Sequence, residues 1–142
     1  MMLDNERIIR ELCAAAEGQG TDIEKFVSMF SEEGYMWDMA SGMKFRGKAI
    51  GESIAGMVSA FPDVHREIFN VHVAGDVVVV ELAIRGTHKG DLPLAAGTLA
   101  PTGKKIDVPS CDVFHLEGGK VKSFHCYNEA SAMQQQLSLV PR

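Results

Sequence analysis

The chain has 142 residues, of which 14 are Lys or Arg and 19 are Asp or Glu, so its formal net charge is −5. Proteins that bind nucleic acids or anionic membranes through charge need clustered basic residues, and the longest basic cluster here is Lys104-Lys105. We therefore expect neither nucleic acid nor a membrane as a partner. No apolar run approaches the roughly 20 residues of a membrane span, so one globular domain is expected.

The cysteines and the chain ends suggest a cellular compartment. Cys13, Cys111 and Cys126 make an odd count, and the first residues lack a basic-then-apolar leader. We therefore expect a cytoplasmic protein with reduced thiols. The last letters, Leu-Val-Pro-Arg at 139–142, match what a cleavable tag leaves behind, and a native ending in the same letters is the alternative. The domain is accordingly expected to span residues 1–138.

Helical periodicity dominates the first part of the chain. Apolar residues recur at helical spacing from Ile8 to Ala16, and the capping box Thr21–Glu24 begins a second helix, which Gly34 is placed to end. Residues 35–46 are expected to form a short strand and a loop. A third helix is predicted from Ile50 to Phe61.

Strand periodicity dominates the rest of the chain. Strands are predicted at about 64–73, 78–84, 106–116 and 121–127, and a short helix at 129–137. Helices first and strands second is an α+β order. We expect one domain in which three N-terminal helices pack on the concave face of a strongly curved antiparallel sheet, with the final helix near its mouth.

A hairpin count through the last two strands brings two titratable residues together. If Gly118-Gly119 is a two-residue loop, Asp112 lies opposite His125 on the apolar face of the sheet. Because a carboxyl group on that face is costly to ionise, its pKa should be raised by burial, and perturbed groups in cavities are candidate site residues. The alternative is a buried structural pair. A one-residue bulge would change which residues meet.

Other chemistries have weaker support. His88 ends a strand whose apolar face enters the core, so it is expected either at the rim of the interior or as a solvated strand-end residue. His65 and His72 fall on opposite faces of one strand, and no histidine pair has the spacing of metal ligands. The chain contains no Walker loop, and Gly18-Gln-Gly20 follows a helix instead of a strand. We expect no metal and no cofactor.

Short motifs in a fixed order resemble a known family, the SnoaL-like polyketide cyclases. They are Phe61-Pro62-Asp63, Arg85 to Gly90, Pro101-Thr102-Gly103, Asp112-Val113-Phe114, Gly119-Lys120-Val121 and Gln135-Gln136-Leu137. The resemblance covers about residues 20–137. It implies the fold of nuclear transport factor 2, a cone of curved sheet and helices around a deep pocket.

The resemblance also implies site residues. The cyclases carry a His-x-Asp pattern on the last strand, where this chain reads Phe124-His125-Cys126. Ketosteroid isomerases, which are similar in fold, place a general-base aspartate at the position of Asp38 and a protonated aspartate at that of Asp112. The oxyanion-hole tyrosine of the isomerases has no counterpart in this chain. In the isomerases the general-base carboxyl group is ionised and the second carboxyl group is neutral, and the resemblance implies the same pair of states here.

The reaction implied is proton abstraction next to a carbonyl of a small apolar ketone or ester. Asp38 would take the proton, and neutral Asp112 or His125 would donate a hydrogen bond to the enolate oxygen. Which of the three acts as the base stays open. The residues expected to contact the substrate are Trp37, Met39, Met57, His88 and Phe114. For each methionine or tryptophan taken singly, ordinary core packing is the alternative.

The alternative hypothesis is a non-catalytic domain that binds a small molecule. Proteins of this fold often dimerise through the outer face of the sheet. The hairpin count gives that face apolar content from Cys111, Val113, Phe124 and Cys126, so a homodimer is expected.

Overall fold

The structure is a computed structural model of the chain and describes residues 4–94 and 97–138; the possible tag remnant at 139–142 lies outside the described residues. Its elements are α1 (Asp4–Ala15), α2 (Ile23–Ser28), β1 (Phe30–Asp38), β2 (Met43–Arg46), α3 (Lys48–Ala60), β3 (His65–Ala74), β4 (Val77–Thr87), β5 (Leu92–Leu94), β6 (Gly97–Leu99), β7 (Lys105–Glu117), β8 (Lys120–Asn128) and α4 (Ala130–Gln136).

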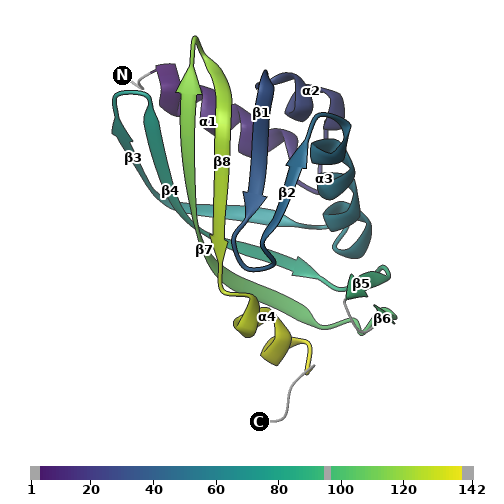
Figure 1. Cartoon of the computed structure of the whole chain (residues 1–142). Helices are drawn as coiled ribbons and strands as arrows, with labels where there is room; N and C mark the ends of the chain where they lie inside the picture. Colours follow the sequence, from purple (N-terminus) through teal and green to yellow (C-terminus); the bar gives the residue numbers. More distant parts are fainter. Residues whose placement is uncertain (1–3, 95–96, 139–142) are drawn as a thin grey trace.

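A six-stranded sheet in the order β2-β1-β8-β7-β4-β3 bends around the helices α1, α2 and α3, and α4 follows β8 at one end of the sheet (Figure 1). The α+β prediction is therefore confirmed. The sheet is mixed and not wholly antiparallel as expected, because β1 pairs parallel with β8. Hairpin signals specify only strands that are neighbours in sequence, and these two strands are far apart in the chain.

The second helix is shorter than predicted. Asp22 caps it by accepting a hydrogen bond on Oδ1 from the backbone nitrogen of Lys25 at 3.0 Å, and the helix ends at Ser28. The prediction that Gly34 ends this helix is wrong, because Gly34 lies inside β1. A Cβ atom there would lie 2.7 Å from the carbonyl oxygen of Val121, so glycine permits the close approach of β1 to β8.

A bulge in the β7–β8 hairpin reverses the expected facing of β8. The pairs Glu117–Lys120 and Leu116–Val121 form as predicted, but the next pair joins His115 to Ser123 and leaves Lys122 unpaired. Asp112 is consequently paired with Cys126, and Val113 with His125. The prediction that Asp112 lies opposite His125 is wrong, since one extra residue moves every later side chain to the other face.

The core lies between the concave face of the sheet and the three N-terminal helices. Phe114 is fully buried there, and its ring centroid lies 4.4 Å from that of Phe124. Ile9 and Leu12 of α1 and Ile50 of α3 are buried against this face as well. Burial of these apolar side chains is the main force that holds the helices against the sheet.

Candidate functional site

A cavity of about 130 Å³ lies between the concave face of the sheet and α3, and we call it the inner cavity. Most of its wall is apolar, with a few polar groups. The lining residues are Met36, Asp38, Phe45, Ser53, Ile54, Met57, Arg66, Ile84, Phe124, Cys126 and Asn128. An apolar cavity with a small number of convergent polar groups is the usual form of a small-molecule site.

Asp38 is the last residue of β1 and is half-buried at the cavity wall. It shares the inner face with Met36, two residues earlier in the strand. Its carboxylate accepts three hydrogen bonds: Oδ2 from Ser41 Oγ at 2.8 Å, and Oδ1 from Asn128 Nδ2 at 3.2 Å and from the backbone nitrogen of Ala40 at 3.3 Å. These donors fix the carboxylate at the cavity wall.

Arg66 brings a positive charge to the same cavity from β3. Its Nη1 donates a hydrogen bond to the carbonyl oxygen of Ala16 at 2.8 Å, and its backbone nitrogen donates to Glu17 Oε2 at 2.8 Å. The sequence analysis missed this residue. The available signal was its position in phase with Val64 and Ile68, which places a basic residue on the apolar face of a strand.

Asp112 is buried in β7, with 3% of its surface exposed, and it does not line the inner cavity. Burial raises its pKa to about 6, and the positive charge of Arg66 partly opposes that rise. The hydroxyl of Ser110 donates a hydrogen bond to Oδ1 at 3.4 Å. Burial likewise raises the pKa of its strand partner Cys126 to about 12, so that thiol is neutral.

His125 lies on the outer face of the sheet, away from the inner cavity. Its Nε2 is 3.0 Å from the hydroxyl oxygen of Tyr35, and its ring meets that of Trp37 edge to face at 5.3 Å between centroids. Partial burial lowers the pKa of His125, and the charges of His115 and Lys44 lower it further. The expected convergence of Asp112 and His125 in one cavity is therefore wrong, and Trp37 faces outward with His125.

The other predicted contact residues divide between the cavity and the core. Met57 of α3 lines the cavity, whereas Phe114 packs beneath it in the core. Met39 follows β1, and its backbone nitrogen donates to the carbonyl oxygen of Cys126 at 2.9 Å. His88 is fully buried, and its Nδ1 accepts from the backbone nitrogen of Thr102 at 3.2 Å. His88 is thus neither a solvated strand end nor part of the cavity wall.

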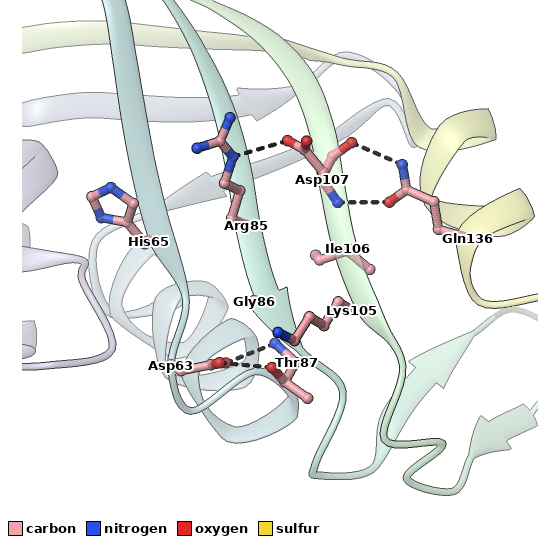
Figure 2. Close-up of a pocket in the computed structure, with 9 residues that line it drawn as sticks. All are labelled: Asp63, His65, Arg85, Gly86, Thr87, Lys105, Ile106, Asp107 and Gln136. Atoms are coloured by element: carbon pink, nitrogen blue, oxygen red, sulfur yellow. Dashed lines mark hydrogen bonds and ion pairs between the residues drawn. The ribbon is translucent and has the colours of Figure 1, made fainter.

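A larger hollow of about 600 Å³ lies where β3, β4 and β7 meet α4, and Figure 2 shows the residues that line it. Its polar groups bind one another. Asp63 accepts from the backbone nitrogen and the hydroxyl of Thr87 at 2.7 and 2.8 Å, and Arg85 Nε donates to Asp107 at 3.1 Å. Gln136 accepts from the backbone nitrogen of Asp107 at 2.7 Å and donates to its carbonyl oxygen at 2.8 Å. The polar groups of this hollow therefore serve mainly to attach α4 to β7.

The two hydrogen bonds between Gln136 and the β7 backbone lead to a stability prediction. The Gln136→Ala protein is expected to lose about 1 to 2 kcal/mol of unfolding free energy, because two hydrogen bonds to the β7 backbone are removed. Urea unfolding would measure the change. The exposed neighbour supplies the control, since Gln135→Ala should alter stability by less than about 0.5 kcal/mol. Equal stability of the two variants would mean that α4 is held by its apolar contacts alone.

Within residues 4–94 and 97–138, no group of three or more His, Cys, Asp or Glu side chains is placed to hold a metal ion. In that same part of the chain, no helix has the length and apolar character needed to cross a membrane.

The profile of the family described as SnoaL-like polyketide cyclase matches residues 8–137. No curated protein sequence matches the chain significantly. Several solved structures share its fold.

One is a candidate SnoaL-like polyketide cyclase from Jannaschia sp. CCS1, with 22% identity over 97% of this chain and 94% of that one and a TM-score of 0.83. Another is IdmH from Streptomyces antibioticus, a candidate polyketide cyclase, with 16% identity, coverage of 94% and 98%, and a TM-score of 0.78. A third, from Catenulispora acidiphila, has a ketosteroid isomerase-like fold and was solved in complex with trimethylamine; its identity is 24%, its coverage 94% and 93%, and its TM-score 0.76. Because the family profile spans nearly all of the described residues, the chain belongs to the SnoaL-like polyketide cyclase family.

Proposed function

We propose that the inner cavity binds a small carbonyl compound and that Asp38 abstracts a proton from the carbon next to its carbonyl. The observation that carries this proposal is the carboxylate of Asp38, held by three donors at the wall of a largely apolar cavity that also contains a guanidinium group. A fixed base facing an apolar space, with a positive charge nearby, suits the formation of an enolate.

The proposed step moves one proton and one electron pair. Asp38 takes the proton, the electron pair of the broken C–H bond forms the carbon–carbon double bond of the enolate, and the carbonyl oxygen takes the negative charge. In an isomerisation the proton returns from Asp38 to another carbon. In a ring closure the enolate carbon attacks a second carbonyl, and the resulting alkoxide takes the proton back.

The cavity volume restricts the substrate. Pockets for drug-sized ligands have volumes of about 300 Å³ or more, whereas the inner cavity has about 130 Å³. A ketone or ester of a few carbons fits such a space. A multi-ring polyketide would require displacement of wall residues, of which Met57 is the most adaptable.

Exchange of hydrogen for deuterium tests the proposal directly. Butanone, acetoacetamide and acetoacetate in deuterated buffer would be followed by proton NMR with and without the wild-type protein. Protein-dependent exchange next to the carbonyl of any of the three supports enolisation. If all three exchange at the buffer rate, the proposal is contradicted.

A second candidate function is binding without catalysis. It is favoured by the three hydrogen bonds to Asp38, since they occupy lone pairs that a base would use. The same NMR samples discriminate the two functions. Ligand-induced shifts in the protein spectrum without exchange of the ligand would indicate a binding domain.

We propose in addition that the protein forms a homodimer through the outer face of the sheet. Cys111 and Val113 contribute to that face, and Tyr35 and Trp37 add aromatic surface. The prediction that Phe124 and Cys126 lie there is wrong, because the bulge in β8 turns both toward the inner cavity. An isologous contact is the commonest way to cover such a surface. Light scattering at micromolar concentration should give twice the mass of one chain, and the mass of a single chain would contradict the proposal.

A further inference from the structure

The guanidinium group of Arg66 has no carboxylate partner among the described residues. Its side chain makes one hydrogen bond, from Nη1 to the carbonyl oxygen of Ala16, and no described carboxylate oxygen lies within 4.0 Å of it. The side chain is half-buried and lines the inner cavity. A cation in this position loses part of its hydration without a counter-charge in direct contact.

The carboxyl groups around Arg66 are engaged elsewhere. Asp38 accepts from Ser41, Ala40 and Asn128. Glu17 uses one oxygen for His65 and the other for the backbone nitrogen of Arg66. Asp112 acts on Arg66 only at longer range, and its Oδ1 accepts a hydrogen bond from Ser110. The remaining donors of the guanidinium are therefore available to a ligand.

The shape of a guanidinium group selects among anions. Its parallel N–H groups match the two oxygens of a carboxylate, and such pairs give both affinity and orientation. A phosphate matches the donors too, but it is more highly charged, so Asp38 in the same cavity of about 130 Å³ repels it more strongly. A small monocarboxylate fits these constraints better.

We propose that the ligand of the inner cavity is a small keto carboxylate, bound through its carboxylate to Arg66 with its keto-bearing carbon directed toward Asp38. Asp38 at the end of β1 and Arg66 on β3 both line this one cavity of about 130 Å³, so a short ligand inside it would lie near both groups. The orientation toward Asp38 rests on the proposed function. The carboxylate contact does not.

A pair of nearly isosteric probes tests the carboxylate contact. Acetoacetate and acetoacetamide differ only in a carboxylate against a neutral amide, so NMR titration of both isolates the effect of the charge. Acetoacetate is expected to bind about tenfold or more tightly than acetoacetamide to the wild type, because a charge-assisted bidentate contact is lost in the amide.

Three variants complete the test. Arg66→Met should remove the preference for acetoacetate, Arg66→Lys should keep part of it, and Arg7→Met, which changes an exposed arginine of α1, should keep all of it. If Arg66→Met unfolds, Arg66→Lys provides the test of the carboxylate contact, because its retained charge should preserve a reduced preference for acetoacetate. An unchanged preference in folded Arg66→Met, equal binding of the two probes to the wild type, or equal binding of inorganic phosphate would overturn the proposal.

The outcome is separable from that of the proposed function. Preferential binding of acetoacetate without catalysed exchange would leave the carboxylate site intact and remove the enolisation. Catalysed exchange of acetoacetamide, with no preference for acetoacetate in binding, would leave the enolisation intact and remove the carboxylate site.

Discussion

The Asp38→Asn protein is expected to keep its fold and its ligand affinity while its catalysis of deuterium exchange in acetoacetamide falls by about two to four orders of magnitude. Asparagine has the same shape and retains an acceptor oxygen for Asn128 or the Ala40 backbone, but it cannot take a proton at neutral pH. Proton NMR in deuterated buffer measures the exchange, and circular dichroism and ligand titration measure fold and affinity.

The control for this substitution is Asp91→Asn, which changes an exposed aspartate outside the cavity. It should leave the exchange rate unchanged. If Asp38→Asn exchanges the probe as fast as the wild type, Asp38 is not the base. His125 would not replace it, since its side chain lies on the outer face of the sheet beside Trp37.

The Asp112→Asn protein is expected to be more stable than the wild type by about 3 kcal/mol at about pH 8 and equally stable at about pH 3. Burial raises the pKa of Asp112 from 3.8 to about 6, so the native state binds a proton more readily than the unfolded state. That contribution is fully present below 3.8 and is lost as the pH rises through about 6. Asparagine stays neutral at every pH, so the Asp112→Asn protein does not lose this stability as the pH rises.

Urea unfolding at several pH values measures this difference. Asp91→Asn again serves as the control, because an exposed aspartate should follow the pH profile of the wild type. Lower stability of Asp112→Asn at high pH would show that the ionised carboxylate is favourable in the native state, with the charge of Arg66 outweighing burial.

Periodicity predicted most of the elements correctly because it reports the face that each element buries. The helical spacing of Ile50 and Ile54 and the alternation of Val78, Val80 and Leu82 correspond to α3 and β4. The parallel pairing of β1 with β8 was missed, because no local signal links strands so distant in sequence. The bulge at Lys122 was missed too, since a single unpaired residue leaves no mark on composition or pattern.

The site was predicted only in part for related reasons. Asp38 and Met57 line the inner cavity as expected. Arg66 escaped notice because a second bulge, at Phe69, breaks the alternation of β3 and leaves Phe69 itself 56% exposed. His125 was placed in the cavity by a hairpin count that the bulge in β8 invalidates. Local irregularities of the sheet thus decided which side chains meet.

Methionine methyl groups provide the most direct test of the central claim, which is that a small carbonyl compound binds in the inner cavity beside Asp38. With ¹³C-labelled methionine methyl groups, titration with acetoacetate should shift the signals of Met36 and Met57, which line the cavity, and leave the exposed Met43 unchanged. Saturable shifts confined to Met36 and Met57 are the predicted result. Unchanged signals of both, or binding that perturbs only residues outside the inner cavity, would contradict the account.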